Sequence, residues 1–125
     1  MSKTPTPIRD SDGLEAALGK PLAVLYKHSP LCGLSALAAR QVEQFMRSRP
    51  DVPVYQVDVV RDRALSRELA RRLATRHESP QALVLRAGDV VWSGSHGNVT
   101  AAALAGALDA GRRAGETSTD REETS

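Results

Sequence analysis

The single cysteine of this sequence, Cys32, lies in the segment HSPLCGLS (28–35). A cysteine thiolate attacks disulfides, and it forms readily where neighbouring groups stabilise negative sulfur. A lone cysteine can also be a small buried hydrophobe, so its surroundings decide between the two interpretations. With one cysteine, the chain can form neither an internal disulfide nor a multi-cysteine metal site. A reactive Cys32 would therefore need a thiol from solution to complete a disulfide exchange.

Side chains close to Cys32 in the sequence could adjust its reactivity. Ser35, three residues on, can donate its hydroxyl or its backbone N–H to the sulfur. Lys27 and His28 can place positive charge near the thiolate and stabilise it. We therefore predict Cys32 and Ser35 as catalytic residues, with Lys27 and His28 tuning the thiolate.

The elements on either side place Cys32 at the start of a helix. Residues 21–26 (PLAVLY) form an apolar run of strand length, typical of a central strand covered on both faces. Residues 33–49 carry apolar side chains at helical spacing and predict a long amphipathic helix. The first turn of a helix has unpaired N–H groups and the positive end of the helix dipole, and both favour an anion. This context favours a reactive Cys32 over a buried one.

The rest of the chain completes an α/β pattern. Further helices are predicted over 11–18, 62–76 and 99–113, and further strands over 52–59, 81–86 and 89–94. Ala87-Gly88 is typical of a hairpin turn, and His77 is predicted to end a helix. The order α-β-α-β-α-β-β-α predicts a thioredoxin-like fold, with a central mixed four-stranded sheet and helices on both faces. In that fold a cis-proline precedes the hairpin and faces the sulfur, so we assign Pro80 to the catalytic site.

Composition and charge suggest how the chain is organised. Residues 10–113 form the predicted domain, residues 1–9 an extended lead-in, and residues 114–125 a disordered acidic tail. The net charge of +2 leaves a mildly basic body, which suits an anionic small-molecule partner. No aromatic-rich basic strand indicates nucleic acid, and no signal or membrane-spanning run is present. We therefore expect a cytoplasmic protein with no membrane partner, and a monomer, because no long apolar stripe marks an interface.

Four segments resemble a known family. They are YKHSPLCGLSALA (26–38), VDVVRDRALSRELA (57–70), RHESPQALVLRAGDVVW (76–92) and SHGNVT (95–100). Over roughly residues 9–110 the chain is similar to the monothiol bacilliredoxins of the bacillithiol system, the YtxJ-like family of bacteria. That family typically carries Thr-Cys-Pro-Ile-Ser at the thiol. Here residues 31–35 read Leu-Cys-Gly-Leu-Ser, which keeps the cysteine and the serine and loses the proline.

The resemblance implies a specific thiol chemistry. It implies removal of bacillithiol from S-bacillithiolated client proteins, with Cys32 becoming the bacillithiolated intermediate. No cofactor is expected, and bacillithiol serves as co-substrate. The predicted ligand-binding residues lie in the proline loop and before the last helix, whose N-terminus suits a carboxylate of the bacillithiol malate. They are Ser79, Ser95, His96, Asn98 and Thr100. Asn98 and Thr100 can equally be helix caps.

Two alternatives stay open at this point. The motif CGLS (32–35) differs at one residue from the Cys-Gly-Phe-Ser of monothiol glutaredoxins, which use glutathione or carry an Fe–S cluster. Against that, the chain has SGSHGNVT (93–100) where glutaredoxins hold glutathione with Gly-Gly and a following Cys/Ser-Asp. The second alternative is a non-catalytic thioredoxin-like interaction module in which Cys32 is incidental.

Overall fold

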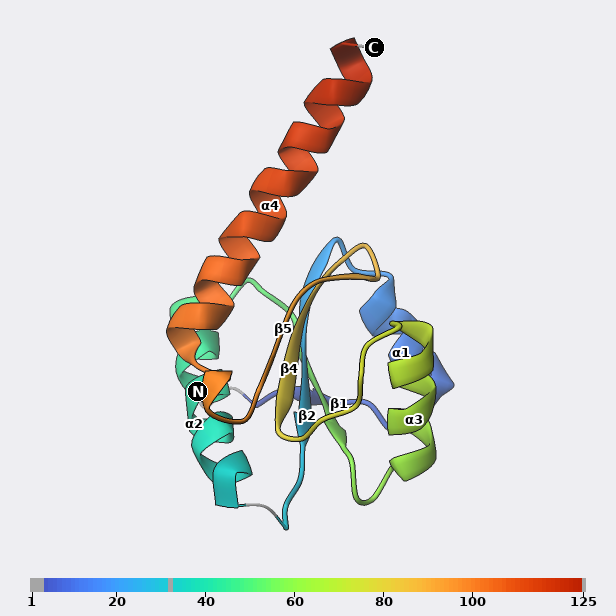
Figure 1. The fold of residues 1–125 in the computed structure, drawn as a ribbon, viewed down its shortest axis with the longest axis vertical. Helices are drawn as coiled ribbons and strands as arrows, with labels where there is room; N and C mark the ends of the chain where they lie inside the picture. The colour runs from blue at the N-terminus through green and yellow to red at the C-terminus, as the bar shows by residue number, and fades with distance from the viewer. Residues whose placement is uncertain (1–3, 32, 125) are drawn as a thin grey trace.

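A five-stranded mixed sheet forms the centre of the protein (Figure 1). The computed structural model describes residues 4–31 and 33–124, with side chains described up to residue 114. The strands are β1 (Thr6–Pro7), β2 (Leu22–His28), β3 (Val54–Asp58), β4 (Gln81–Arg86) and β5 (Asp89–Ser95). The helices are α1 (Ser11–Leu18), α2 (Gly33–Ser48), α3 (Arg63–Arg72) and α4 (Ala101–Thr124), with a 3-10 turn, η1 (His96–Asn98), before the last.

The strand order β1-β3-β2-β4-β5 puts β2 in the middle, as its apolar sequence predicts. β1, β3 and β2 run parallel to one another, whereas β4 pairs antiparallel with both β2 and β5. The register sets Lys27 at the end of β2 opposite Gln81 at the start of β4. The residue after the proline loop therefore lies directly beside the strand that leads to Cys32.

Two apolar layers cover the two faces of the sheet. Alternate residues of β2, such as Val24 and Tyr26, join the cluster under α2 and α4, while Ala23 and Leu25 join the one under α1 and α3. Figure 1 shows the two helix pairs on opposite sides of the sheet. An ion pair with two hydrogen bonds, Arg49 to Asp109 at 2.9 and 3.0 Å, ties the residue after α2 to α4. The predicted arrangement of helices on both faces is confirmed.

The sheet has one strand more than the four that the sequence predicts. Within residues 1–9, predicted as an extended lead-in, Thr6 and Pro7 pair in parallel with Tyr55 and Gln56 of β3. Proline has no N–H to give a neighbouring strand, so it fits at the edge of a sheet. The buried side chain of Ile8 then anchors this edge strand in the α1/α3 layer.

Helix ends differ from the sequence pattern in two places. α3 ends at Arg72 instead of residue 76, and Ala74 beyond it has a positive φ of 48°. α4 is drawn to Thr124, beyond residue 113, where the sequence predicted its end, and the disordered acidic tail over residues 114–125 stays a prediction. Once the packed part of a helix is formed, each added residue gains one hydrogen bond without a new nucleation cost, and no proline interrupts residues 101–124. In Figure 1 this end of α4 projects beyond the sheet.

No helix in the described part of the chain is long and apolar enough to cross a membrane.

The β4–β5 hairpin is closed by the predicted turn and covered by the single tryptophan. Ala87 and Gly88 both have positive φ values, 50° and 85°, as tight hairpin turns require. Further along β5, the Trp92 indole lies over Gly94. A Cβ atom placed on Gly94 would come within 2.4 Å of the Trp92 ring. Glycine at this position is therefore required for the observed place of Trp92.

We predict that Gly94→Ala displaces the Trp92 indole and lowers the free energy of unfolding by about 1–3 kcal/mol, the usual cost of overpacking. Because Trp92 is the only tryptophan, its fluorescence emission reports the displacement directly. Gly97→Ala is the matched control, since a Cβ at Gly97 meets nothing within 4 Å. An unshifted emission spectrum and unchanged urea midpoint for Gly94→Ala would contradict this packing.

Candidate functional site

The segment that carries Cys32 lies at the surface, at the carboxyl end of the central strand. β2 ends at His28, and α2 begins at Gly33, so the thiol segment is the short connection between them. Cys32 itself lies outside the described residues. Its neighbours Leu31 and Gly33 are both exposed, Leu31 by 83%. The strand–turn–helix context predicted for the thiol is confirmed.

Ser35, buried in the first turn of α2, forms hydrogen bonds to residues on the β2 side of this connection. Its side chain is fully buried, and its Oγ accepts a hydrogen bond from the backbone N–H of Ser29 at 3.2 Å. Its backbone carbonyl accepts a hydrogen bond from the Tyr26 hydroxyl at 3.0 Å. Ser35 therefore ties both ends of the connection together. Its hydroxyl still has a hydrogen to give, and donation to the Cys32 sulfur stays a prediction.

His28 is held in one tautomer by Tyr26. The Tyr26 hydroxyl lies 2.9 Å from His28 Nδ1, and its one hydrogen is already donated to the Ser35 carbonyl. His28 Nδ1 must then donate to the tyrosine oxygen, which leaves the lone pair of the neutral ring on Nε2. A hydroxyl inside an apolar strand needs a polar partner, so Tyr26 could have been recognised from the sequence.

The predicted proline loop lies beside the thiol segment. The Ser79–Pro80 peptide bond is cis, as expected, and Pro80 is buried. The Pro80 carbonyl accepts a hydrogen bond from the His96 N–H at 2.9 Å. Ser79 and Ser95 are half-buried, and Ser95 pairs with Gln81 across the hairpin. The sheet register thus brings Ser79, Pro80, Ser95 and His96 to the same end of the sheet as the thiol segment.

A groove of about 410 Å³ runs between the first half of α2 and the start of α4. His96 and Thr100 line it, whereas Ser79, Ser95 and Asn98 do not. The other lining residues were not predicted as site residues. They are Leu34, Leu37, Ala38, Arg40, Gln41, Gly97 and Val99. The sequence signal for those that belong to α2 is the amphipathic pattern of this helix, where Leu34 and Leu37 are 46% and 59% exposed despite apolar side chains.

The N-terminus of α4 already has internal partners. The Thr100 hydroxyl accepts a hydrogen bond from Ala103 N–H at 3.1 Å, so the capping interpretation of Thr100 is confirmed. Gln41 Oε1 accepts a second one, from Ala101 N–H at 2.9 Å. Asn98 lies in η1 and is exposed. These two bonds leave fewer α4 N–H groups for a carboxylate ligand than the sequence suggested.

The backbone of His96 lies in the left-handed region. Its φ is +54°, in the left-handed region that side chains other than glycine rarely adopt. Such strain persists only where neighbours hold it, and here the bond from its N–H to the Pro80 carbonyl does so. Ala74 and Ala87 share this backbone region, and the ligand-binding role of His96 stays a prediction.

Lys27 and His28 lie on opposite faces of the sheet, because neighbouring residues of a strand alternate. His28 faces the α2 side with Tyr26. Lys27 is fully buried on the α3 side, with its Nζ 3.1 Å from His77 Nδ1. Burial lowers the pKa of Lys27 from 10.5 to about 8. The two predicted tuning residues therefore lie on opposite sides of the sheet, and their effect on the thiolate stays a prediction.

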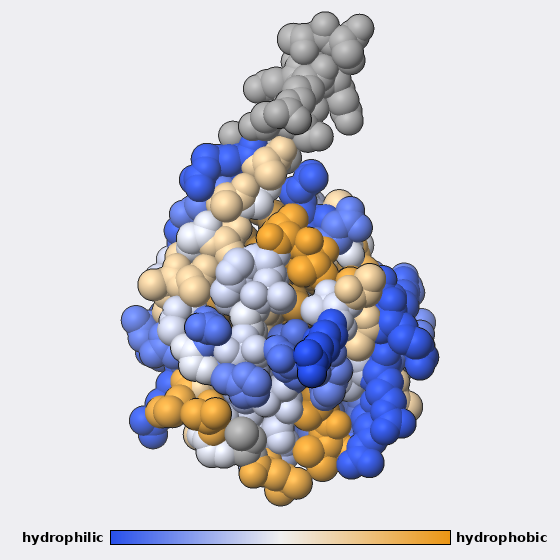
Figure 2. Space-filling model, in the orientation of Figure 1, coloured by the Kyte–Doolittle hydropathy of each residue, from blue (hydrophilic) through white to orange (hydrophobic). Residues whose placement is uncertain are grey.

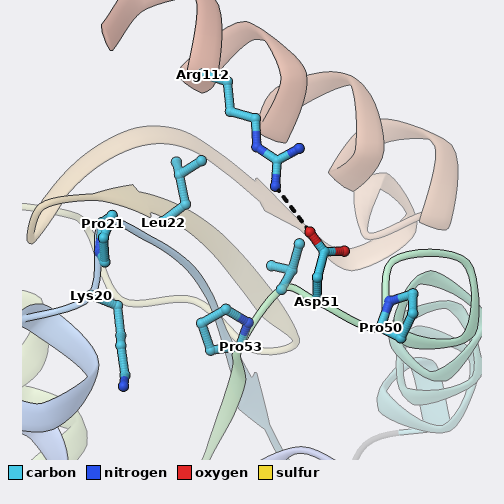
Figure 3. A pocket seen from close by; sticks show the side chains of 8 residues that line it. Lys20, Pro21, Leu22, Pro50, Asp51, Pro53 and Arg112 are labelled. Atoms are coloured by element: carbon cyan, nitrogen blue, oxygen red, sulfur yellow. Dashed lines mark hydrogen bonds and ion pairs between the residues drawn. The ribbon is translucent and has the colours of Figure 1, made fainter.

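A second hollow, of about 560 Å³, lies at the other end of the sheet (Figure 3). Lys20, Leu22 and three prolines contribute to its lining, and Arg112 pairs with Asp51 across it at 3.3 Å. Leu22 begins the strand that His28 ends, a span of about 20 Å at strand spacing. This hollow contains none of the predicted site residues.

The fold and the thiol segment define a class of protein. One solved structure, described as a putative oxidoreductase with a thioredoxin fold, is 32% identical with a TM-score of 0.77, over 82% of this chain and 91% of that chain. Thioredoxin from Trypanosoma brucei brucei is 15% identical with a TM-score of 0.72, over 87% and 91%. Thioredoxin F from spinach chloroplast is 20% identical with a TM-score of 0.67, over 86% and 92%. The protein has the thioredoxin fold, as its element order predicts.

The family is defined more closely by a sequence profile. The profile described as monothiol bacilliredoxin BrxC matches residues 6–104. The chain therefore belongs to the monothiol bacilliredoxin family, and the resemblance noted from its motifs is confirmed. Family and fold together give the protein a thiol redox role.

The burial of Lys27 predicts how stability depends on pH. Below pH 8 the folded and unfolded chains both carry the lysine proton, and the folded chain bears the full cost of a buried ammonium. Between about 8 and 10.5 the folded chain releases that proton first, so this cost falls and stability rises with pH. Lys27→Met should raise the free energy of unfolding at pH 7 by on the order of 1–3 kcal/mol.

Urea denaturation of both proteins at several pH values measures this effect. The advantage of Lys27→Met should shrink as the pH rises from 8 to 10. An advantage that is constant over this range would contradict a charged, buried Lys27. Lys20→Met, which removes an exposed lysine, is the control and should show no such trend.

Proposed function

We propose that this protein removes bacillithiol from mixed disulfides with client proteins, using Cys32 as the nucleophile. The observation that carries the proposal is the position of the only cysteine. It lies between β2 and α2 in a chain that belongs to the monothiol bacilliredoxin family. The start of a helix is a place where a thiolate is favoured.

The exchange proceeds in two balanced steps. The Cys32 thiolate attacks the bacillithiol sulfur of the mixed disulfide, a new disulfide forms to Cys32, and the client thiolate leaves and takes up a proton. A second thiolate from solution then attacks the bacillithiol sulfur of the Cys32–bacillithiol disulfide, forms a new disulfide with bacillithiol, and releases the Cys32 thiolate. The external thiol is required because the sequence contains no second cysteine. No cofactor takes part in either step, and bacillithiol is a co-substrate.

Apolar surface around the thiol supports a protein as the other substrate. Leu31, Leu34 and Leu37 are exposed large hydrophobic residues, and all three lie within five residues of Cys32. Figure 2 shows apolar surface at the lower end of the molecule, the end where α2 begins in Figure 1. A client segment that presents a modified cysteine could bury apolar side chains here. Exposed apolar patches of this kind mark interaction sites.

The groove between α2 and α4 supports a place for the malate of bacillithiol. Arg40 and His96 line this groove and can meet a carboxylate, and Thr100 adds a hydroxyl. The other predicted ligand residues, Ser79, Ser95 and Asn98, lie outside the groove lining. In this proposal they contact the part of bacillithiol, or of the client chain, that is nearer to the proline loop.

The first test compares two mixed-disulfide peptides as substrates. With free bacillithiol as the second thiol, we expect a bacillithiolated peptide to be converted to the free peptide thiol and bacillithiol disulfide, and we expect little turnover of the same peptide carrying glutathione. Cys32→Ser should abolish this conversion, while Ser48→Ala, a hydroxyl removed at the far end of α2, should not. Preference for the glutathionylated peptide would support a glutaredoxin-like protein instead. No turnover of either peptide would support a non-catalytic module.

The second test addresses the groove. Arg40→Gln should raise KM for the bacillithiolated peptide by about three- to tenfold and leave kcat nearly unchanged, since a carboxylate contact remote from the sulfur is lost equally in ground and transition states. Arg47→Gln, an exposed arginine seven residues along the same helix, is the control. Thr100→Ala is a poor probe because Thr100 caps α4. An unchanged KM for Arg40→Gln would exclude this placement of the malate.

A further inference from the structure

The buried polar residues of the described chain gather at the thiol end of the sheet. There are five: Lys27, Ser29, Ser35, Ser66 and Gln81. Ser29 and Ser35 belong to the thiol segment itself. The other three lie on the opposite face of the sheet, under α3, where the neighbouring layer is otherwise apolar. Polar groups are costly to bury in such a layer, so their presence there requires an explanation.

These three residues form one cluster with His77. Lys27 Nζ lies 3.1 Å from His77 Nδ1, which in turn lies 3.4 Å from Ser66 Oγ. Gln81 is the cross-strand partner of Lys27 and donates from Nε2 to the Arg76 carbonyl at 3.0 Å. Its Oε1 is buried and has no hydrogen-bond partner among the described residues. Since His77 is exposed, the Lys27 cluster (Lys27, Ser66, His77 and Gln81) reaches from the sheet interior to solvent.

Only one hydrogen can lie between Lys27 Nζ and His77 Nδ1, so one of these nitrogens donates and the other accepts. If Lys27 is an ammonium, it donates to the lone pair of His77 Nδ1, and the imidazole is neutral with its hydrogen on Nε2. If His77 Nδ1 carries the proton, Lys27 must be a neutral amine that accepts it. Burial lowers the pKa of both groups, and the charge of Lys27 lowers the pKa of His77 further. Near neutral pH the pair therefore carries one positive charge, and it resides on Lys27.

No described carboxylate neutralises this charge at close range. None of the ion pairs within 4 Å among the described residues includes Lys27. The charged neighbours of the pair are Arg67 of α3, which lowers the pKa of His77, and Glu78 of the following loop, which raises it. On β4 the neighbour of Lys27 is the neutral Gln81. On the β3 side the neighbour of Lys27 is the apolar Val57. An unneutralised buried cation is costly to stability, and such groups are found mainly where function needs them.

We propose that Lys27 is the cation that favours the Cys32 thiolate, and that His77 is a positioning residue that keeps Lys27 protonated by accepting its hydrogen bond. The anion produced at this end of the sheet is the thiolate, five residues along the chain from Lys27. A unit charge in the interior acts over several ångströms even without direct contact. The inference rests on Cys32 being a nucleophile, as the thiol redox role requires, and does not depend on which small thiol it carries.

The test is the rate of Cys32 alkylation by iodoacetamide between pH 5 and 9. Lys27→Met should move the midpoint of thiolate formation upward and slow alkylation at pH 6.5 on the order of tenfold. His77→Ala should slow alkylation at pH 7.5 by about threefold, since Lys27 loses its acceptor and gives up its proton more readily. His77→Gln should restore the rate, because the amide oxygen can accept the same hydrogen bond. Lys20→Met, an exposed lysine at the other end of the sheet, should match the wild type.

A measurement on the unmodified protein serves as a second test that does not depend on variants folding. Linkage is reciprocal, so blocking Cys32 with iodoacetamide should lower the titration midpoint of Lys27, followed by NMR at its side-chain carbons. Unchanged titration of Lys27 on alkylation, or unchanged alkylation profiles in Lys27→Met, would overturn the inference. Failure of the bacillithiol assay with shifted alkylation profiles would overturn the proposed substrate alone.

Discussion

The antiparallel register between β2 and β4 is the constraint on which the site depends. It pairs Lys27 with Gln81, so the cis-Pro80 loop must lie beside the strand that ends in the thiol segment. The same hairpin pairs Gln81 with Ser95 and brings His96 to the Pro80 carbonyl. A shift by one residue would exchange the faces of Lys27 and His28 and separate both from their partners.

The two faces of the sheet carry different polar contacts near the thiol segment. On the α2 face, the Tyr26 hydroxyl and the Ser29 N–H both reach Ser35, so the connection between strand and helix is fixed by side chains that are themselves buried. On the α3 face, Lys27 and His77 form a hydrogen-bonded pair that carries a positive charge and, among the described residues, makes no contact that fixes the thiol segment. This division follows from strand alternation: adjacent residues of one strand serve opposite layers. In our proposal, the thiol segment is held in place by contacts on one face and influenced by charge from the other.

The sequence predicts those parts of the fold that depend on local pattern. The α1 and β4 ranges, the hairpin turn at Ala87-Gly88 and the cis-proline all follow from periodicity, turn chemistry or element order. β1 was missed as a strand because two residues with a proline have no strand pattern of their own, and they pair only because β3 offers an edge. The early end of α3 was missed because the apolar spacing continues to Leu73. The left-handed conformation of Ala74 has no signal in the residue type.

The candidate site was predictable only where its residues are close in the sequence or have fixed places in the fold. The thiol segment and proline loop could be identified because their residues are close in the sequence or occupy fixed places in the fold. The contact of His77 with Lys27 could not be predicted, since 50 residues separate them and only the chain path after α3 brings them together. Tyr26 and the groove residues of α2 had weak signals, a hydroxyl in an apolar strand and leucines left exposed on a helix.

Intact-mass analysis of the protein tests the central claim most directly. The chain is incubated with a bacillithiolated peptide and then quenched with acid, which stops thiolate exchange. The account predicts a mass gain of one bacillithiol, located on Cys32 by fragmentation, and a much smaller gain of glutathione from the matching glutathionylated peptide. An unmodified Cys32 after both incubations, with the peptide disulfides intact, would contradict it.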